Sequence, residues 1–299
     1  MSPAIEIDDA WLLARPLPCP DSTADKDERG SILVIAGSAE TPGAAWLGGV
    51  AALRAGAGKL CIATVASVAA GLAMRLPEAR VIGLPESAEG GLAPAGLDRL
   101  DALLDTTAAI LVGPGLRDEP ASAAFVHRLL ERAPRAGLVL DALGMSVVSL
   151  AGRFERAPLL TPHAGEMAHL SGLSKEEVAA DSERVARDMA ARWNGIVVLK
   201  GATTTIALPG GGALVHRGGN VGLATSGSGD VLAGLIAGLV ARGMALEVAA
   251  AWGVALHARA GAALAFSRGP LGYLASELAA EVPALMAGLA DRAAEGAPS

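Results

Sequence analysis

The stretch Ser31-Ile32-Leu33-Val34-Ile35-Ala36-Gly37 decides how this chain is expected to fold. It is a continuous apolar run that ends at a glycine, which is typical of a strand buried on both faces of a parallel sheet. The segment that follows, residues 43–57, has a helical sequence and ends at Gly58. A buried strand followed by a helix is the repeating unit of an α/β fold.

The same unit recurs along the chain. Further strands are predicted at 60–64, 80–84, 108–112, 137–140, 159–160 and 196–199, with helices at 67–75, 94–104, 119–132 and 175–193. A β-hairpin is predicted from 203–208 and 213–216, followed by helices at 231–242, 246–266 and 273–287. We therefore expect a single-domain α/β fold, with a mostly parallel central sheet and helices on both faces. Residues 1–29 are predicted to be an N-terminal arm with one short helix near 8–15, and residues 30–299 the domain.

Composition excludes several classes of protein. The chain of 299 residues is 52% hydrophobic, which supports a large core, and its net charge of −7 argues against a nucleic-acid binder. Its two cysteines, Cys19 and Cys61, form no disulfide framework, and the N-terminus lacks the pattern of a signal peptide, so we expect a cytoplasmic protein. The apolar stretch Leu60–Met74 is too short and too broken to span a bilayer, so no membrane partner is expected.

The most informative motif is Ser226-Gly227-Ser228-Gly229-Asp230-Val231-Leu232-Ala233-Gly234-Leu235. Small residues lead into an aspartate that opens an apolar helix. Backbone N–H groups of such a loop and of the helix N-terminus form an anion site, and the Asp230 carboxylate beside it suits a general base. The alternative is an ordinary N-capped helix, since aspartate is a favoured cap.

Other motifs follow predicted strands, where ligands of open α/β sheets bind. Gly113-Pro114-Gly115 allows close approach of a ligand, or forms only a tight turn. In Thr161-Pro162-His163-Ala164-Gly165-Glu166, His163 can donate to a polar substrate, and Glu166 can hold a hydrated cation or act only as a first-turn helix acid. Lys200-Gly201-Ala202-Thr203-Thr204 suits a nucleotide phosphate, or leads only into the hairpin.

Taken in this order, the motifs resemble the ribokinase-like superfamily and, within it, the ADP/ATP-dependent NAD(P)H-hydrate dehydratases. Ala36-Gly37-Ser38, Pro42-Gly43-Ala44-Ala45 and the helix Ala52-Leu53-Arg54-Ala55-Gly56-Ala57-Gly58 carry the resemblance together with the elements above. The Gly-x-Gly-Asp element fits any ribokinase-like kinase, whereas Thr161–Glu166 narrows the resemblance to the dehydratases. The resemblance implies a repair enzyme that returns the S epimer of hydrated NADH or NADPH to NAD(P)H. The ring hydroxyl is phosphorylated and phosphate is then eliminated, with Mg²⁺ present.

The resemblance also implies roles for residues. Asp230 is expected to be the base that activates the hydroxyl, and Ala44, Gly115, His163 and Asp230 are expected to bind the hydrated dinucleotide. Glu166 is expected to hold the metal through water. The expected contacts of the adenine nucleotide are Lys200, Gly201, Ala202, Thr203, Thr204, Gly227, Ser228 and Gly229.

Three functions remain open at this point. The first is the dehydratase, with a preference for ADP over ATP, a functional link to a separate NAD(P)HX epimerase, and a possible homo-oligomer. The second is a ribokinase-like kinase of a small alcohol or vitamin precursor, which would release a stable phosphorylated product. The third is a nucleotide-sensing protein that has lost catalysis.

Overall fold

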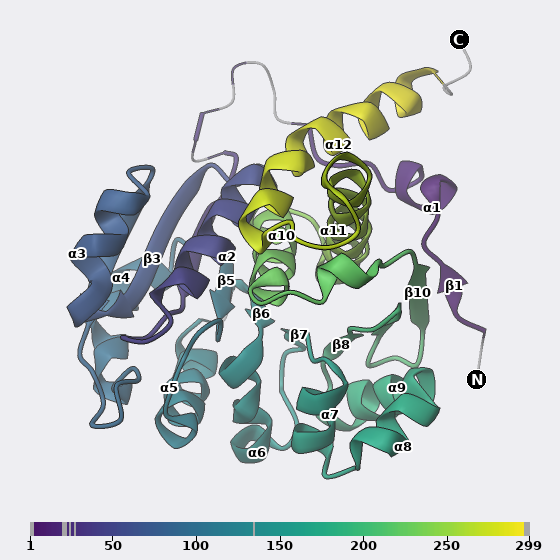
Figure 1. Ribbon diagram of the computed structural model, residues 1–299. Helices are drawn as coiled ribbons and strands as arrows, with labels where there is room; N and C mark the ends of the chain where they lie inside the picture. Colours follow the sequence, from purple (N-terminus) through teal and green to yellow (C-terminus); the bar gives the residue numbers. More distant parts are fainter. Residues whose placement is uncertain (1–2, 20–22, 24, 27, 134, 296–299) are drawn as a thin grey trace.

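One sheet of ten strands runs through the computed structural model, which describes residues 3–19, 23, 25–26, 28–133 and 135–295 (Figure 1). The strands lie in the order β1-β10-β9-β8-β7-β6-β5-β2-β3-β4. Their bounds are β1 Ile5–Glu6, β2 Ser31–Ile35, β3 Lys59–Val65, β4 Ala79–Leu84, β5 Ala109–Val112, β6 Gly137–Leu140, β7 Leu159–Leu160, β8 Ile196–Leu199, β9 Thr203–Ala207 and β10 Ala213–Arg217.

The sheet is parallel from β4 to β8, as the alternating sequence predicts. β9 runs antiparallel to both β8 and β10, which confirms the predicted hairpin. β1 was not predicted; it lies in the expected N-terminal arm and pairs parallel with β10. Part of that arm, residues 1–2, 20–22, 24 and 27, lies outside the described residues.

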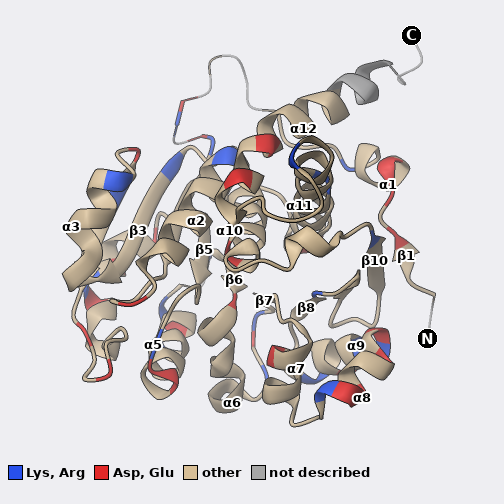
Figure 2. Cartoon of the chain, viewed as in Figure 1, with Lys and Arg blue, Asp and Glu red and all other residues tan. Residues whose placement is uncertain are grey.

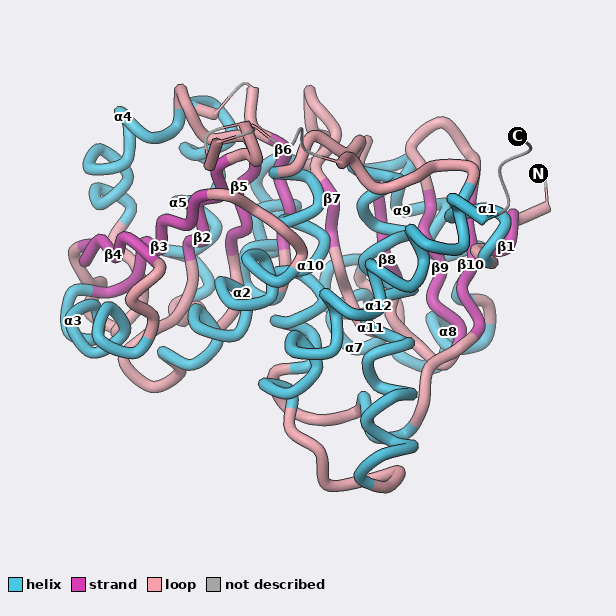
Figure 3. Tube along the Cα trace, turned by 90° about the horizontal axis from the view of Figure 1, so that it is seen from above, coloured by secondary structure: helices cyan, strands magenta, loops and turns pink. Residues whose placement is uncertain are grey.

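Helices cover both faces of the sheet, which Figure 3 shows as a row of strands between helical layers. The α-helices are α1 Asp9–Leu13, α2 Pro42–Arg54, α3 Ala66–Arg75, α4 Asp101–Leu104, α5 Glu119–Arg132, α6 Val148–Ala151, α7 Ala164–Ser171, α8 Lys175–Ala180, α9 Ser182–Trp193, α10 Ser228–Ala241, α11 Leu246–Arg268 and α12 Ala275–Glu295. The 3₁₀ helices are η1 Pro94–Leu100, η2 Ala142–Val147 and η3 Val221–Leu223.

Alternate residues of each inner strand enter two separate cores. In β2, Ile32 and Val34 join the core under α2, α10, α11 and α12, whereas Leu33 and Ile35 join the core under α5 and α9. All four side chains are at most 1% exposed. The sequence of β2 is therefore apolar without interruption because helices cover both faces of the strand, as predicted.

The long helix α11 is apolar enough, and long enough, to cross a membrane by length and composition. However, 67% of its most apolar window is buried inside the protein. The core helix of a folded α/β domain has the same character, so α11 is explained by packing between α10 and α12 (Figure 1).

Three predicted helices differ in detail. The segment 175–193 is two helices, α8 and α9, because Asp181 leaves helical geometry and its carboxylate accepts a hydrogen bond from the Arg184 N–H at 3.2 Å, capping α9. The segment 94–104 is mostly the 3₁₀ helix η1, followed by the short α4. The last helix begins at Ala275 rather than at residue 273 and continues to Glu295, beyond the predicted end at 287.

Candidate active site

Strand ends from the middle of the sheet bring several charged side chains together. Asp141 follows β6, Thr161 follows β7 and Lys200 follows β8. One oxygen of Asp141, Oδ1, accepts hydrogen bonds from the Thr161 hydroxyl at 2.6 Å and from the Lys200 ammonium at 3.3 Å. Three neighbouring parallel strands are thus linked at their carboxyl ends, where ligands of open α/β sheets bind.

This cluster stands out because the interior is otherwise nearly free of charge. Figure 2 shows the inner strands and the helices α10 and α11 mostly without acidic or basic residues. Of the Asp, Glu, Lys and Arg side chains that the structure describes, Asp141 and Arg187 are buried, and Asp141 is only 2% exposed. A buried carboxylate needs a cation or strong donors, and Lys200 and Thr161 supply them.

Lys200 lies at the centre of the cluster. Its Nζ is 3.7 Å from Glu166 Oε2, and a Cβ added to Gly229 would lie 3.3 Å from the same Nζ. Burial alone lowers the pKa of Lys200, but the carboxylates of Asp141, Glu166 and Asp230 outweigh burial and raise that pKa. Lys200 is therefore a fixed positive charge between the first turn of α10 and the first turn of α7.

Asp230 lies in the first turn of α10. Burial, and then the negative charges of Asp141 and Glu166, raise the pKa of this carboxyl from 3.8 to about 7, although Lys200 acts in the opposite direction. A carboxyl group with a pKa near neutrality is able both to take and to hold a proton at working pH. That is the property required of a general base or acid.

The anion loop, residues 226–229, includes the first two residues of α10. Gly227 has a φ of +85° and caps the helix, and a Cβ there would lie 2.5 Å from the Leu47 side chain. A side chain at position 227 is therefore excluded by both backbone geometry and space. The loop approaches Lys200 through Gly229, so the N–H groups at the start of α10 and the Lys200 ammonium lie around the same region.

His163 and Glu166 begin α7 as a reciprocal cap. The Nδ1 of His163 accepts from the N–H groups of Gly165 at 3.0 Å and Glu166 at 3.2 Å, and Glu166 Oε2 accepts from the His163 N–H at 2.8 Å. Since Nδ1 is an acceptor, Nε2 of His163 carries a hydrogen, and this nitrogen lies 3.6 Å from Glu166 Oε2. The His163 side chain is 59% exposed. Ala164 begins this helix without disturbing the cap.

Ala44 and Gly115 lie in contact with each other near the start of α2. Gly115 has a φ of +64°, and a Cβ there would lie 2.6 Å from the Ala44 Cβ. The Thr41 hydroxyl donates to the Gly115 carbonyl at 2.7 Å and accepts a 2.7 Å hydrogen bond from the Ser38 hydroxyl. Small residues at both positions therefore allow the two backbone segments to lie close together.

The segment Lys200–Thr204 turns out of the sheet edge. Gly201 and Ala202 are exposed, Thr203 begins β9, and the Thr204 hydroxyl donates to the Gly201 carbonyl at 3.4 Å. All the expected nucleotide contacts therefore lie on two segments that meet where Gly229 approaches Lys200.

A cavity of about 450 Å³ adjoins His163 and Glu166. Its other walls include Ala142, which has a left-handed φ of +45°, and the Glu119–His169 pair, joined at 2.9 Å. The volume is within the range of small-molecule sites. Residues in a strained backbone conformation, such as Ala142, are common beside functional sites.

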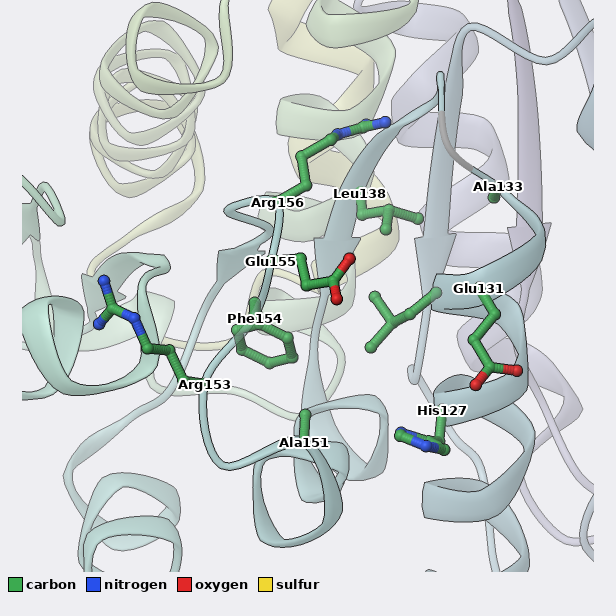
Figure 4. A pocket seen from close by; sticks show the side chains of 10 residues that line it. His127, Glu131, Ala133, Leu138, Ala151, Arg153, Phe154, Glu155 and Arg156 are labelled. Carbon is green, nitrogen blue, oxygen red and sulfur yellow. The ribbon is translucent and has the colours of Figure 1, made fainter.

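A second cavity, of about 430 Å³, lies near the amino ends of β6 and β7, away from the carboxyl edge where Asp230 lies (Figure 4). His127 and Glu131 of α5, Phe154 and Glu155 line it, while Arg153 turns away to donate to the Ala191 carbonyl at 2.7 Å. None of the predicted site residues belongs to this cavity.

Some residues of the site were not assigned a role from sequence. They are Asp141, Thr161 and His257. The signal for Asp141 was present, because an aspartate directly after a buried strand lies at the ligand edge. His257 gave no such signal, since it lies in the middle of α11 and reaches Ser228 only in the folded chain.

Across residues 3–295, apart from the gaps given above, no group of three or more His, Cys, Asp and Glu side chains is arranged to hold a metal ion. Magnesium is usually held by one or two carboxylates, waters and substrate phosphates, so it needs no such group. Glu166, whose Oε2 is shared with the cap, is a carboxylate of that kind at this edge.

The chain is similar throughout most of its length to proteins of one family. Residues 32–284 match the family model described as NAD(P)H-hydrate dehydratase. A Xanthomonas campestris protein named ADP-dependent (S)-NAD(P)H-hydrate dehydratase is 48% identical over 277 residues, covering 93% of this chain and 94% of that protein. A bifunctional NAD(P)H-hydrate repair enzyme of Moorella thermoacetica is 38% identical over 285 residues, and the chain spans 53% of it.

Solved structures give the same picture. An ADP/ATP-dependent NAD(P)H-hydrate dehydratase from Bacillus subtilis, co-crystallised with ATP and Mg²⁺, has a TM-score of 0.81 at 29% identity, covering 97% of this chain and 99% of that one. Hydroxyethylthiazole kinase from Pyrococcus horikoshii has a TM-score of 0.56 at 14% identity, covering 87% of this chain and 89% of that one. The second match shows a shared fold alone, and the ribokinase-like fold expected from sequence is confirmed.

Proposed function

The chain belongs to the NAD(P)H-hydrate dehydratase family, and from this premise we propose that it restores NAD(P)H from the S epimer of its hydrated form at the expense of ADP. The observation that carries the proposal is the Asp230 carboxyl, with a pKa of about 7, beside the anion loop and Lys200. The preference for ADP over ATP rests on the name of the 48% identical relative.

The proposed chemistry begins with proton removal. Asp230 accepts the proton of the hydroxyl at C6 of the hydrated nicotinamide ring as the oxygen attacks the terminal phosphoryl group of ADP, and AMP leaves. Phosphate then departs from C6 with its bonding electrons and takes a proton from the neighbouring ring carbon, whose C–H electrons form the restored double bond. Phosphorylation makes chemical sense because hydroxide is a poor leaving group and phosphate is a good one.

The anion loop and Lys200 have the proposed role of stabilising charge. N–H groups at the start of α10 and the Lys200 ammonium face the place where the phosphoryl group would lie between donor and acceptor oxygens. We assign the adenine-nucleotide contacts to Gly227, Ser228 and Gly229 and to the Lys200–Thr204 segment, of which Gly201 and Ala202 are exposed. Neither segment is a Walker A loop, so phosphate binding rests on the helix N-terminus and one lysine.

We assign the hydrated dinucleotide to Ala44, Gly115, His163 and Asp230. Ala44 and Gly115 provide a close backbone surface, and the exposed His163 side chain can turn its Nε2 from Glu166 Oε2, 3.6 Å away, to the substrate. The 450 Å³ cavity next to His163 and Glu166 offers room for part of the dinucleotide. Asp230 is near this cavity, because the charge of Glu166, which lines it, acts on the Asp230 carboxyl.

Mg²⁺ is proposed as the cation of the reaction, held by Glu166 through water and by the nucleotide phosphates. When bound, it would neutralise charge on the phosphates during transfer. The protein's own contribution at this point is the cap at the start of α7, which fixes the Glu166 carboxylate by the 2.8 Å hydrogen bond from the His163 N–H.

We further propose a cytoplasmic enzyme, a homo-oligomer, with a functional link to an NAD(P)HX epimerase. The link follows from the chemistry, since an enzyme that acts on one epimer consumes only that epimer. The bifunctional NAD(P)H-hydrate repair enzymes among the relatives support it. The N-terminal arm of residues 1–29 and the domain of residues 30–299 remain a prediction.

The direct test uses a mixture of hydrated NADH epimers, Mg²⁺ and either ADP or ATP. The proposal predicts a nucleotide-dependent return of the near-ultraviolet absorbance of NADH, faster with ADP, that stops at the S-epimer fraction and is completed by added epimerase. A phosphorylated alcohol that accumulates without NADH would instead assign the chain as a small-molecule kinase. Nucleotide binding with no product of either kind would assign a sensing role.

A further inference from the structure

A buried histidine of α11 contacts the first residue of α10. The Nε2 of His257 lies 2.9 Å from the Ser228 hydroxyl oxygen and 3.1 Å from the Ser228 carbonyl oxygen. His257 is 9% exposed and Ser228 is 4% exposed. The helices α10 and α11 pack along each other, so this contact joins the anion loop to the core (Figure 1).

The two contacts determine where the hydrogens lie. A carbonyl oxygen can only accept, so the 3.1 Å contact requires a hydrogen on Nε2 of His257. The same N–H is then shared with the Ser228 hydroxyl oxygen, which accepts it. The hydroxyl hydrogen of Ser228 is not used in this contact and remains available to an anion held by the loop.

We propose that His257 is a positioning residue of the anion loop: by donating to both oxygens of Ser228, it fixes the loop and leaves the Ser228 hydroxyl to donate to a nucleotide phosphate. The inference rests on the proposed function, because the phosphate is that of the adenine nucleotide. It adds to that function a residue from a distant helix that does not touch substrate.

The protonation state of His257 is consistent with this arrangement. Burial, assisted by the positive charge of Lys200, lowers the pKa of His257 to about 4, although its hydrogen bond with Ser228 acts in the opposite direction. The imidazole is therefore neutral at working pH and keeps a single hydrogen. A neutral donor orients the loop without adding a second buried cation beside Lys200.

The test compares three replacements of His257. Gln can place an amide N–H near the position of Nε2, whereas Asn is too short to reach it and Leu has no donor. We expect His257→Leu and His257→Asn to weaken binding of Mg-ADP about tenfold and to lower kcat about tenfold, with the KM for hydrated NADH unchanged. His257→Gln should stay within about threefold of the unmodified chain in both measurements.

A second arm shows whether His257 acts through Ser228. Ser228→Ala should itself weaken Mg-ADP binding, and His257→Asn should add little in that background, because the hydroxyl that it positions is gone. His127→Leu is the matched control, a partly buried histidine of α5 at the distant cavity, and it should leave binding and turnover unchanged.

Two results would overturn the inference. One is equal Mg-ADP affinity, measured by calorimetry, in a folded His257→Asn variant and the unmodified chain. The other is an equal loss in the Gln and Asn variants that follows only their melting temperatures. Calorimetry needs no turnover, so the two proposals fail separately: an unmodified chain that binds Mg-ADP but forms no NADH overturns the proposed function, while the binding arm still decides the role of His257.

Discussion

The two ends of helix α10 are built for different purposes. From Leu232 onward the helix is buried and packs against α2, so closely that a Cβ on Gly234 would lie 2.3 Å from the Gly48 carbonyl oxygen. A Cβ on Gly238 would lie 2.5 Å from the Ala52 carbonyl oxygen. The first turn also buries Ser228 and Val231, but it places the charged side chain of Asp230 near Lys200 and other carboxylates.

The comparison indicates that the stability of this helix and its chemistry come from different residues. Close packing of small residues gains dispersion contacts along the body of α10. Burial of the Asp230 charge opposes folding, as its raised pKa shows. The body of the helix therefore holds an unfavourable but reactive carboxyl in a fixed place.

Removing the base should have the largest effect. Asp230→Asn keeps the size of the side chain but cannot accept the proton, so we expect kcat to fall by about 10²–10⁴-fold. Mg-ADP binding should remain close to that of the unmodified chain, because the N–H groups of the loop are retained. Turnover within a few fold of normal would remove Asp230 from the proposed mechanism.

The same variant should be more stable above neutral pH. A carboxyl whose pKa is raised from 3.8 to about 7 on folding holds its proton more tightly in the folded state. Stability from this group is therefore present at low pH and is lost as the pH rises from about 4 to 7. At pH 8, Asp230→Asn should gain up to about 4 kcal/mol in free energy of unfolding, and at pH 4 almost nothing. Urea unfolding at both pH values checks this, and equal gains at both would contradict it.

Substitution in the body of α10 should lower the stability of the protein, whereas Asp230→Asn should raise it. Gly234→Ala forces a methyl group against the Gly48 backbone and should lower the free energy of unfolding by about 1–3 kcal/mol. Gly71→Ala in the exposed part of α3 is the matched control, because a Cβ there meets nothing within 4 Å. It should stabilise the protein by about 0.5–1 kcal/mol. Urea unfolding of both variants shows whether the loss of stability in Gly234→Ala comes from close packing or from the loss of a glycine. Equal changes in the two variants would contradict the packing explanation.

A smaller effect is expected when the positive charge of Lys200 is removed. Lys200→Met removes a positive charge that lowers the pKa of Asp230, so the pH dependence of turnover should shift to higher pH. At neutral pH we expect kcat to fall about tenfold and Mg-ADP affinity to weaken by a similar factor. Lys175→Met, on exposed α8, is the control and should change neither. An unshifted pH profile in the Lys200→Met variant would contradict an effect of the Lys200 charge on the pKa of Asp230.

The sequence predicts more of the fold than of the site. The apolar runs of β2, β5 and β8 identified their strands, because burial on both faces leaves a plain signal. Asp181 broke a predicted helix through a side-chain cap, a local competition that periodicity does not show. The glycine loop and Asp230 were found from their pattern. Contacts between distant segments, such as Asp141 with Lys200 and His257 with Ser228, depend on strand order and helix packing, which no local pattern contains.

The most direct test of the account is the pH dependence of kcat/KM for hydrated NADH with saturating Mg-ADP. The account predicts a tenfold fall for each unit of pH below about 7, because Asp230 must lose its proton before it can act as the base. The unmodified chain should show this fall, and Asp230→Asn should show little activity across the range. A profile that stays flat down to about pH 5 would contradict the account, since the carboxyl at the start of α10 would then not be the group that takes the proton.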